Sequence, residues 1–223
     1  MTLLEQYNNL SDMEKNALMI YKSKLFLFIN NLEEILNNAY KYEKYKKFFE
    51  EYRSYVIDPI NSFMRFSVFS IVDFSDYEKF LKSIKNVREI LFSIEGKLTI
   101  PYDMRVYRMV SSEKDLDVIF KNSLVSTTTD IAVTDNFYVY GKKNSLLSID
   151  IPKGTPCLVV PYSVVIKDVD GRYHLQVVNN DSQSEVILFG PSLDYEIKEK
   201  RYFEDEALTV YKISAKPVKE KTY

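Results

Sequence analysis

The chain has 223 residues, of which 46% are hydrophobic and 28% charged, a composition typical of globular proteins with a buried core. Its 30 basic and 32 acidic residues leave a formal charge of −2, so it lacks the positive field that attracts nucleic acid or an anionic membrane. A single cysteine, Cys157, and a single histidine, His174, exclude an intramolecular disulfide, a Cys/His zinc cluster and a catalytic triad that needs more than one imidazole. We expect Cys157 to be a small core residue.

No targeting segment is recognisable at the start of the sequence. Residues Met1–Glu5 lack the basic and apolar regions of a signal peptide. The apolar stretch Ala17–Ile29 is interrupted by Lys22 and Lys24 and is too short to span a bilayer. We therefore expect a soluble protein, either made inside a host cell or delivered there by a dedicated export machine.

Helices are predicted for residues 1–97. The segment Ser11–Glu14 is a capping box, in which a serine oxygen and a glutamate carboxylate satisfy free amides at a helix start. Beyond it, apolar residues recur in steps of three and four and define one helix face: Leu18, Tyr21, Leu25, Phe28, Ile29 and Leu32. A further helix is predicted over Tyr42–Val56, with Pro59 ending it or starting another.

A second capping box is predicted at Ser75–Glu78, with Gly96 as the C-terminal stop of the helix that follows. The apolar face of this helix comprises Phe80, Leu81, Ile84, Val87, Ile90 and Leu91. We expect the methionine and aromatic side chains of the whole helical part to fill a core.

After Pro101 the pattern changes to short β-type runs separated by turns. These runs cover Arg105–Val110, Leu124–Thr128, Ser145–Ile151, Cys157–Val160, Val164–Lys167, Tyr173–Val178, Glu185–Phe189, Asp194–Lys198 and Leu208–Ile213. One helix interrupts them, from a cap at Ser111 or Ser112 through Phe120. Successive strands with few helices between them predict an α+β protein with mostly antiparallel pairing. We expect a single domain over residues 1–223, with a helical part at 1–97 and a β-rich part at 98–223.

Two further features lie in the β-rich part. The runs before and after Asp170-Gly171 predict a β-hairpin over residues 164–178, to which the sequence assigns no role. The Lys- and Glu-rich end from Lys216 is predicted to be solvated.

Three short motifs in the β-rich part could carry chemistry. Arg108 alternates with Val106 and Val110, and an arginine among apolar neighbours either forms a salt bridge at a sheet edge or grips phosphate bidentately. The hydroxyl cluster Ser126–Thr129 either holds a catalytic carboxylate or ends a strand ahead of a turn. Glu185 begins an apolar run, where a carboxylate is common on structural grounds alone.

The order of these motifs resembles that of the ADP-ribosyltransferase toxins with an Arg, Ser and Glu signature. Those enzymes carry an aromatic-Arg pair in the first strand, then a Ser-Thr-Ser/Thr strand, then Gln-x-Glu or Glu-x-Glu at a later strand start. The segment Ile149–Pro156 resembles the region around their V-P-K-G turn, and Glu185–Leu188 resembles their E-V-L-L strand. The resemblance covers roughly the last 125 residues. The helical part is similar only in kind to that of the compact Rho-modifying exoenzymes.

This resemblance implies an N-terminal helical layer followed by a split, two-sheet, mostly antiparallel core, with NAD in the cleft between the sheets. It implies that the chain cleaves NAD, as substrate, at the nicotinamide-ribose bond and transfers ADP-ribose to a macromolecule, without a metal. The implied catalytic residues are Glu185, Gln183 and Ser126. The implied cofactor-binding residues are Arg108 for the pyrophosphate, Tyr107, Thr127 and Thr128, and Phe137 or Tyr140 for stacking on the nicotinamide.

The acceptor is expected to be a host protein, with nucleic acid less favoured and no membrane partner. In the resembling family, a glutamate two residues before the catalytic one accompanies arginine targets. Here that position holds Gln183, whose neutral amide suits an asparagine, a glutamine or a hydroxyl in the target. Two alternatives remain: an NAD glycohydrolase that uses water as acceptor, and a catalytically inactive interaction module in which Arg108 and Glu185 are a structural pair.

Overall fold

The computed structural model describes residues 3–22, 25–57, 71–110, 116, 120, 124–160, 163–167, 173–177 and 185–218. The chain divides into two compact units. The helical unit comprises Leu10–Ile94 and Lys167–Tyr173, and the sheet unit comprises Met1–Asn9, Glu95–Ile166 and His174–Tyr223. That the two units act as a single domain stays a prediction.

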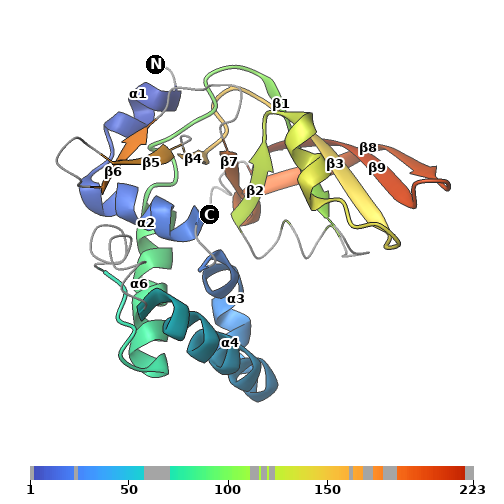
Figure 1. The fold of residues 1–223 in the computed structure, drawn as a ribbon. Coiled ribbons are helices and arrows are strands. Elements are labelled where there is room, and N and C mark those ends of the chain that lie inside the picture. Colours follow the sequence, from blue (N-terminus) through green and yellow to red (C-terminus); the bar gives the residue numbers. More distant parts are fainter. Residues whose placement is uncertain are drawn as a thin grey trace, which may run out of the picture. The chain divides into compact units, whose positions relative to one another are not determined.

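The helical unit contains α2 (Asp12–Lys22), α3 (Phe26–Asn37), α4 (Ala39–Ile57) and α6 (Tyr77–Ser93), shown in Figure 1. Its centre is aromatic, because Phe28, Phe49 and Phe80 are fully buried. The ring centroids of Phe28 and Phe80 are 4.9 Å apart, and those of Phe49 and Phe80 are 4.7 Å apart. The predicted core-filling role is confirmed for these aromatic residues, whereas Met13 and Tyr40 are 56% and 75% exposed.

The first capping box is confirmed at the start of α2. The Ser11 amide donates to the Glu14 carboxylate at 2.8 Å, and the Glu14 amide donates to the Ser11 hydroxyl at 3.4 Å. The apolar face that follows is divided between two helices, since α2 ends at Lys22 and α3 begins at Phe26. The spacing conceals this break because Leu25, just before α3, is itself fully buried and no side chain caps α3.

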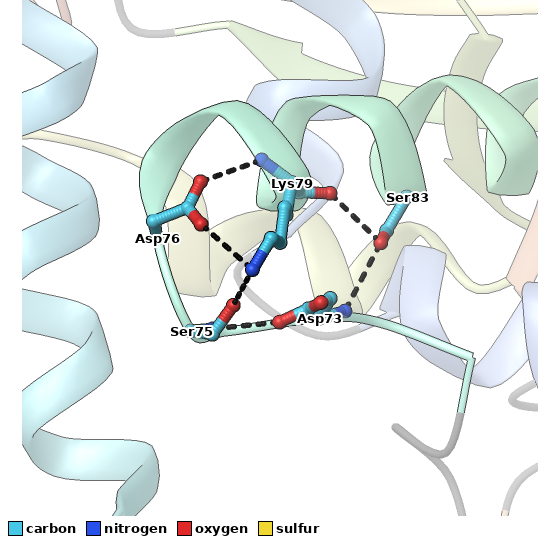
Figure 2. A network of polar contacts seen from close by, with 5 residues as sticks. All are labelled: Asp73, Ser75, Asp76, Lys79 and Ser83. Carbon is cyan, nitrogen blue, oxygen red and sulfur yellow. Dashed lines mark hydrogen bonds and ion pairs between the residues drawn. The ribbon is translucent and has the colours of Figure 1, made fainter.

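The prediction of the second capping box places the N-cap one residue too early. The N-cap of α6 is Asp76, whose carboxylate accepts the Lys79 amide at 2.9 Å. Ser75 lies outside the helix, and its amide donates to the Asp73 carboxylate at 2.8 Å. Figure 2 shows the network that results, in which Ser83 accepts the Asp73 amide at 3.0 Å and donates to the Lys79 carbonyl at 3.0 Å. Aspartate caps a helix as well as serine does, so the pattern alone could not separate the two registers.

The sheet unit contains a seven-stranded sheet in the order β4-β7-β2-β1-β3-β9-β8 and a two-stranded sheet of β5 and β6. The strands are β1 (Met104–Val110), β2 (Leu124–Thr128), β3 (Asn144–Ile151), β4 (Cys157–Val160), β5 (Ser163–Lys167), β6 (Tyr173–Val177), β7 (Glu185–Phe189), β8 (Leu193–Phe203) and β9 (Leu208–Pro217). Every pairing specified in the large sheet is antiparallel except that of β3 with β9. The α+β class and the mostly antiparallel pairing are thus confirmed.

Strands β1 and β2 are paired over a shorter length than the other neighbouring strands of the large sheet. Their register pairs Tyr107 with Thr128, whereas β2 and β7 are paired from Leu124 to Thr128. The strands β4-β7-β2 and β1-β3-β9-β8 are therefore joined through this one pair of residues within a single seven-stranded sheet.

Some expectations changed or lie outside the described residues. Strands β8 and β9 extend further than predicted, so Lys216 pairs with Asp194 and does not begin a solvated tail. The turn of the predicted hairpin lies outside the described residues, although β5 and β6 form its two strands. Of the predicted helix ending at Phe120, Leu116 and Phe120 are described and both are buried.

Local contacts fix the segments that flank the sheet. Helix α1 (Leu3–Asn8) is attached through Gln6, whose side chain accepts the Thr99 amide at 2.7 Å and donates to the Thr99 carbonyl at 3.0 Å. In the turn before β4, Gly154 has a φ of +85° and its amide donates to the Ile100 carbonyl at 2.8 Å. Cys157 is fully buried as predicted, and burial raises the pKa of its thiol to about 12. None of the described helices is both long enough and apolar enough to cross a membrane.

Candidate active site

The paired strands β2 and β7 place the predicted hydroxyls beside the predicted carboxylate. Strand β7 begins at Glu185, which pairs with Thr128, while Ser126 pairs with Ile187. Paired residues project to the same face of a sheet, and alternate residues of one strand share a face. The side chains of Ser126, Thr128 and Glu185 therefore lie on one face of the sheet.

Ser126 connects two residues that are distant in sequence. Its hydroxyl donates to Oε1 of Glu185, 59 positions away. Its carbonyl oxygen accepts a hydrogen bond of 2.7 Å from Nη1 of Arg108, 18 positions away. All three residues are half-buried, so the carboxylate is oriented by the protein while part of the group stays accessible.

Arg108 reaches Ser126 from the opposite face of the sheet. It alternates along β1 with Tyr107, which pairs with Thr128 on the Glu185 side. A backbone carbonyl lies close to the plane of the sheet and can be reached from either face. The arginine and the glutamate thus approach the same serine from two sides, at the point where β1 and β2 are joined through Tyr107 and Thr128.

The structure does not bring Thr127 to this group. Thr127 is 4% exposed, and its hydroxyl donates to the Val186 carbonyl at 2.6 Å, which fastens β2 to β7. Thr128 lies on the Glu185 face, and its hydroxyl accepts the Asp130 amide at 3.1 Å. Of the two threonines predicted to bind the cofactor, geometry therefore favours Thr128.

The two candidate aromatic residues lie at and beyond the end of the 3-10 helix η2 (Ile131–Phe137). Asp130 caps η2 by accepting the Ala132 amide at 2.9 Å. Phe137 is 61% exposed and Tyr140 is 90% exposed. The Tyr140 ring packs edge-on against Tyr138 at 5.2 Å between centroids.

Asn144 is a residue that the motifs did not indicate. It is 1% exposed, and its side chain accepts the Val139 amide at 3.1 Å and donates to the carbonyls of Val139 and Lys142 at 3.0 and 2.9 Å. A buried asparagine at a strand start gives no recognisable sequence signal. Gln183 lies outside the described residues. Among the residues described, no group of three or more His, Cys, Asp and Glu side chains could hold a metal ion.

No protein-family model and no curated protein sequence matches the chain, but solved structures do. An ADP-ribosyltransferase from Clostridium botulinum is 13% identical, over 96% of this chain and 92% of that one, with a TM-score of 0.49. The ADP-ribosylating toxin of a C. perfringens binary enterotoxin, solved with NADH, is 12% identical over 96% of this chain and 45% of that one, with a TM-score of 0.48.

A third similar structure is an ADP-ribosyltransferase toxin from Paenibacillus larvae. It is 13% identical, over 97% of this chain and 91% of that one, with a TM-score of 0.42. Identities and TM-scores this low establish no function for the chain.

Proposed function

We propose that the chain is a mono-ADP-ribosyltransferase, which cleaves NAD at the nicotinamide-ribose bond and transfers ADP-ribose to a macromolecular acceptor. The observation that carries this proposal is the double contact of Ser126, through its hydroxyl with Glu185 and through its carbonyl with Arg108. These contacts hold an oriented carboxylate close to a guanidinium group. An enzyme that cleaves a dinucleotide at its ribose needs both charges, a negative one for the ribose and a positive one for the pyrophosphate.

Glu185 is assigned the central chemical role. When the bond between C1′ of the ribose and the nicotinamide nitrogen breaks, nicotinamide leaves with the electron pair and the ribose becomes oxocarbenium-like. The carboxylate accepts a hydrogen bond from the ribose 2′-hydroxyl and opposes the developing positive charge. The acceptor nucleophile then forms its bond to C1′ and loses its proton. Ser126 keeps the carboxylate oriented through this sequence.

Arg108 is assigned to the pyrophosphate. A guanidinium carries several N–H donors in a planar fork, a geometry that matches phosphate oxygens. Tyr107 and Thr128 lie in the same row of paired residues as Glu185 and are assigned to line the NAD site. Phe137, which ends η2, or Tyr140 just beyond it is assigned to stack on the nicotinamide.

The acceptor side chain is proposed to be an amide or a hydroxyl rather than an arginine. This rests on Gln183, which stands two residues before Glu185 and offers both a donor and an acceptor. Gln183→Ala should lose transfer yet keep NAD hydrolysis, since water needs no such guide. Gln183→Glu should not improve modification of the native target. Mass spectrometry that mapped ADP-ribose only to arginine would contradict this assignment.

The test of the proposed function uses two labels. The unmutated chain is incubated with an animal-cell lysate and NAD labelled either in the nicotinamide or in the adenine. Release of nicotinamide together with covalent transfer of the adenine label supports the proposal. Release without transfer identifies an NAD glycohydrolase, and no binding of millimolar NAD by calorimetry identifies an inactive interaction module.

A further inference from the structure

The row of paired residues that contains Glu185 defines one face of the large sheet, here named the Glu185 face. Its members are Glu185, Thr128, Tyr107 and Ser148. Paired residues share a face, and so do alternate residues of one strand. Asn144 lies four positions before Ser148 on β3, so its side chain projects from the Glu185 face as well. In the proposed reaction, the ribose of NAD meets the carboxylate on this face.

Three hydrogen bonds join the side chain of Asn144 to the loop of residues 138–143. It accepts the Val139 amide at 3.1 Å and donates to the carbonyls of Val139 and Lys142 at 3.0 and 2.9 Å. Asn144 is 1% exposed, whereas residues 140–143 are all exposed. A buried amide that satisfies the backbone groups of an exposed loop fixes the path of that loop.

The same segment is also fastened at its beginning and in its middle. At the beginning, the Thr128 hydroxyl accepts the Asp130 amide at 3.1 Å, and η2 then packs against β1 and β2. In the middle, the Tyr138 hydroxyl donates to the Glu206 carbonyl in the turn between β8 and β9. Thr128 and Asn144, the side chains that hold the two ends, both project from the Glu185 face.

Both aromatic residues assigned to the nicotinamide lie on this fastened segment. Phe137 is 61% exposed and Tyr140 is 90% exposed, so neither ring fills the core. The Tyr140 ring packs edge-on against Tyr138, whose hydroxyl is bound to the β8-β9 turn. A ring on a loop that is already ordered binds its partner more tightly, because less conformational freedom is lost on binding.

We propose that Asn144 is a positioning residue of the NAD site, which fixes the 138–143 loop so that Phe137 or Tyr140 stacks on the nicotinamide; this rests on the proposed function. Because Asn144 is 1% exposed, it acts through the loop and not by contact with NAD. The pyrophosphate is assigned to Arg108, which contacts the Ser126 carbonyl on β2. Asn144 should therefore affect the nicotinamide end of the dinucleotide alone.

The experiment compares two ligands that differ only in the nicotinamide. The KM for NAD is measured from nicotinamide release without an acceptor, and ADP-ribose is measured as a competitive inhibitor of the same reaction. Asn144→Ala should raise the KM for NAD about tenfold, the effect of losing one aromatic contact, and leave the inhibition constant of ADP-ribose unchanged. Arg108→Lys, by contrast, should raise both constants, which shows that the assay responds to the pyrophosphate.

Gln6→Ala is the matched control, because Gln6 is another buried amide with backbone partners. It is 5% exposed, accepts the Thr99 amide at 2.7 Å and donates to the Thr99 carbonyl at 3.0 Å. Its removal costs the fold similar hydrogen bonds, so the melting temperature should fall in both variants. Gln6→Ala should change neither constant.

Gly141→Ala tests the same loop from its exposed side if Asn144→Ala does not fold. Gly141 has a φ of +73°, and a Cβ there would meet nothing within 4 Å, so alanine strains the loop backbone without disturbing the core. This variant should raise the KM for NAD and leave the inhibition by ADP-ribose unchanged. Gly154→Ala, a left-handed position outside the loop, should change neither constant.

A third comparison shows whether Asn144 acts through the aromatic rings. In a Phe137→Ala/Tyr140→Ala background, Asn144→Ala should add no further rise in the KM for NAD, since residues that act together are not additive. A further rise would overturn the positioning role. So would an unchanged KM, or an equal rise in both constants, in folded Asn144→Ala or in Gly141→Ala. Absence of nicotinamide release by the unmutated chain would instead overturn the proposed function itself.

Discussion

The polar network at the start of α6 and the polar group around Ser126 use similar side chains over very different spans of sequence. The first lies entirely between Asp73 and Ser83 and satisfies backbone amides at a helix start (Figure 2). The second joins Arg108, Ser126 and Glu185 across separations of 18 and 59 positions. The first network caps the start of a helix, whereas the second holds a carboxylate and a guanidinium group in one half-buried place.

This difference predicts opposite effects of mutation. Removing a capping group should lower the stability of the fold and leave NAD chemistry intact. Removing a group from the Ser126 cluster should impair NAD chemistry and leave the fold intact, because residues arranged for function contribute little to stability.

The largest effect is expected for Glu185→Gln. The amide keeps the size of the carboxylate but cannot oppose positive charge on the ribose, so NAD cleavage should fall about 10²-fold or more. The melting temperature should stay within a degree or so of the unmutated value. Glu196→Gln is the matched control, since Glu196 is an exposed glutamate paired with Lys198 on β8. Near-normal turnover of Glu185→Gln would remove this residue from the mechanism.

A smaller effect is expected for Arg108→Lys. The ammonium group retains the charge but not the planar fork, so the KM for NAD should rise about tenfold, the effect of losing one charge-assisted hydrogen bond. Arg105→Lys is the control on the same strand, because Arg105 forms an exposed ion pair of 2.6 Å with Asp150. If both variants show the same KM as the unmutated chain, Arg108 does not bind the pyrophosphate.

The sequence predicted those parts of the fold that are fixed by burial. Strands β2 and β7 have the expected bounds because their side chains are largely buried, and the bounds of β4 are also as expected. Strands β8 and β9 were predicted too short, since the outer half of β8 is exposed and carries charges that resemble a loop. The division between α2 and α3 was missed because apolar spacing continues through the break.

The candidate site was also predictable only in part. The proximity of Ser126 and Glu185 follows from the motif order, and the structure shows the hydrogen bond between them. The contact of Arg108 with the Ser126 carbonyl could not be foreseen, because a backbone acceptor has no sequence signature. Asn144 was missed for a related reason, since its partners Val139 and Lys142 are also backbone groups.

In the helical unit, Asp76→Ala should lower the melting temperature by a few degrees without changing NAD cleavage. The backbone hydrogen bond from Lys79 is the main cause that lowers the pKa of Asp76 in the folded state. Its stabilisation is therefore present above the unfolded pKa of about 4 and is lost as the pH falls through the lower folded value. The difference in melting temperature between Asp76→Ala and the unmutated chain should thus be largest at neutral pH and become smaller in strong acid.

Asp76→Asn separates the cap from its charge. Asparagine keeps an oxygen acceptor for the Lys79 amide, so its melting temperature at neutral pH should lie close to that of the unmutated chain. A drop as large as that of the alanine variant would show that the ion pair with Lys79, and not the cap, stabilises this end of α6.

The smallest effect is expected from Ala207→Gly, which tests whether the sheet unit stores strain outside the Ser126 cluster. Ala207 has a φ of +46° in the β8-β9 turn, and its carbonyl accepts the Asn144 amide at 2.9 Å. The left-handed conformation costs a residue with a Cβ about 1–2 kcal/mol, part of which is offset because glycine gains freedom in the unfolded chain. We expect the melting temperature to rise by about 2 °C, with NAD cleavage unchanged.

The control for Ala207→Gly is the reverse substitution at another left-handed position, Gly154→Ala. Gly154 has a φ of +85° and a Cβ there would meet nothing within 4 Å, so this variant should have a lower melting temperature through backbone strain alone. A lower melting temperature for Ala207→Gly would mean that the Ala207 side chain stabilises the turn by contact, so that this turn, like the cap of α6, depends on its side chain.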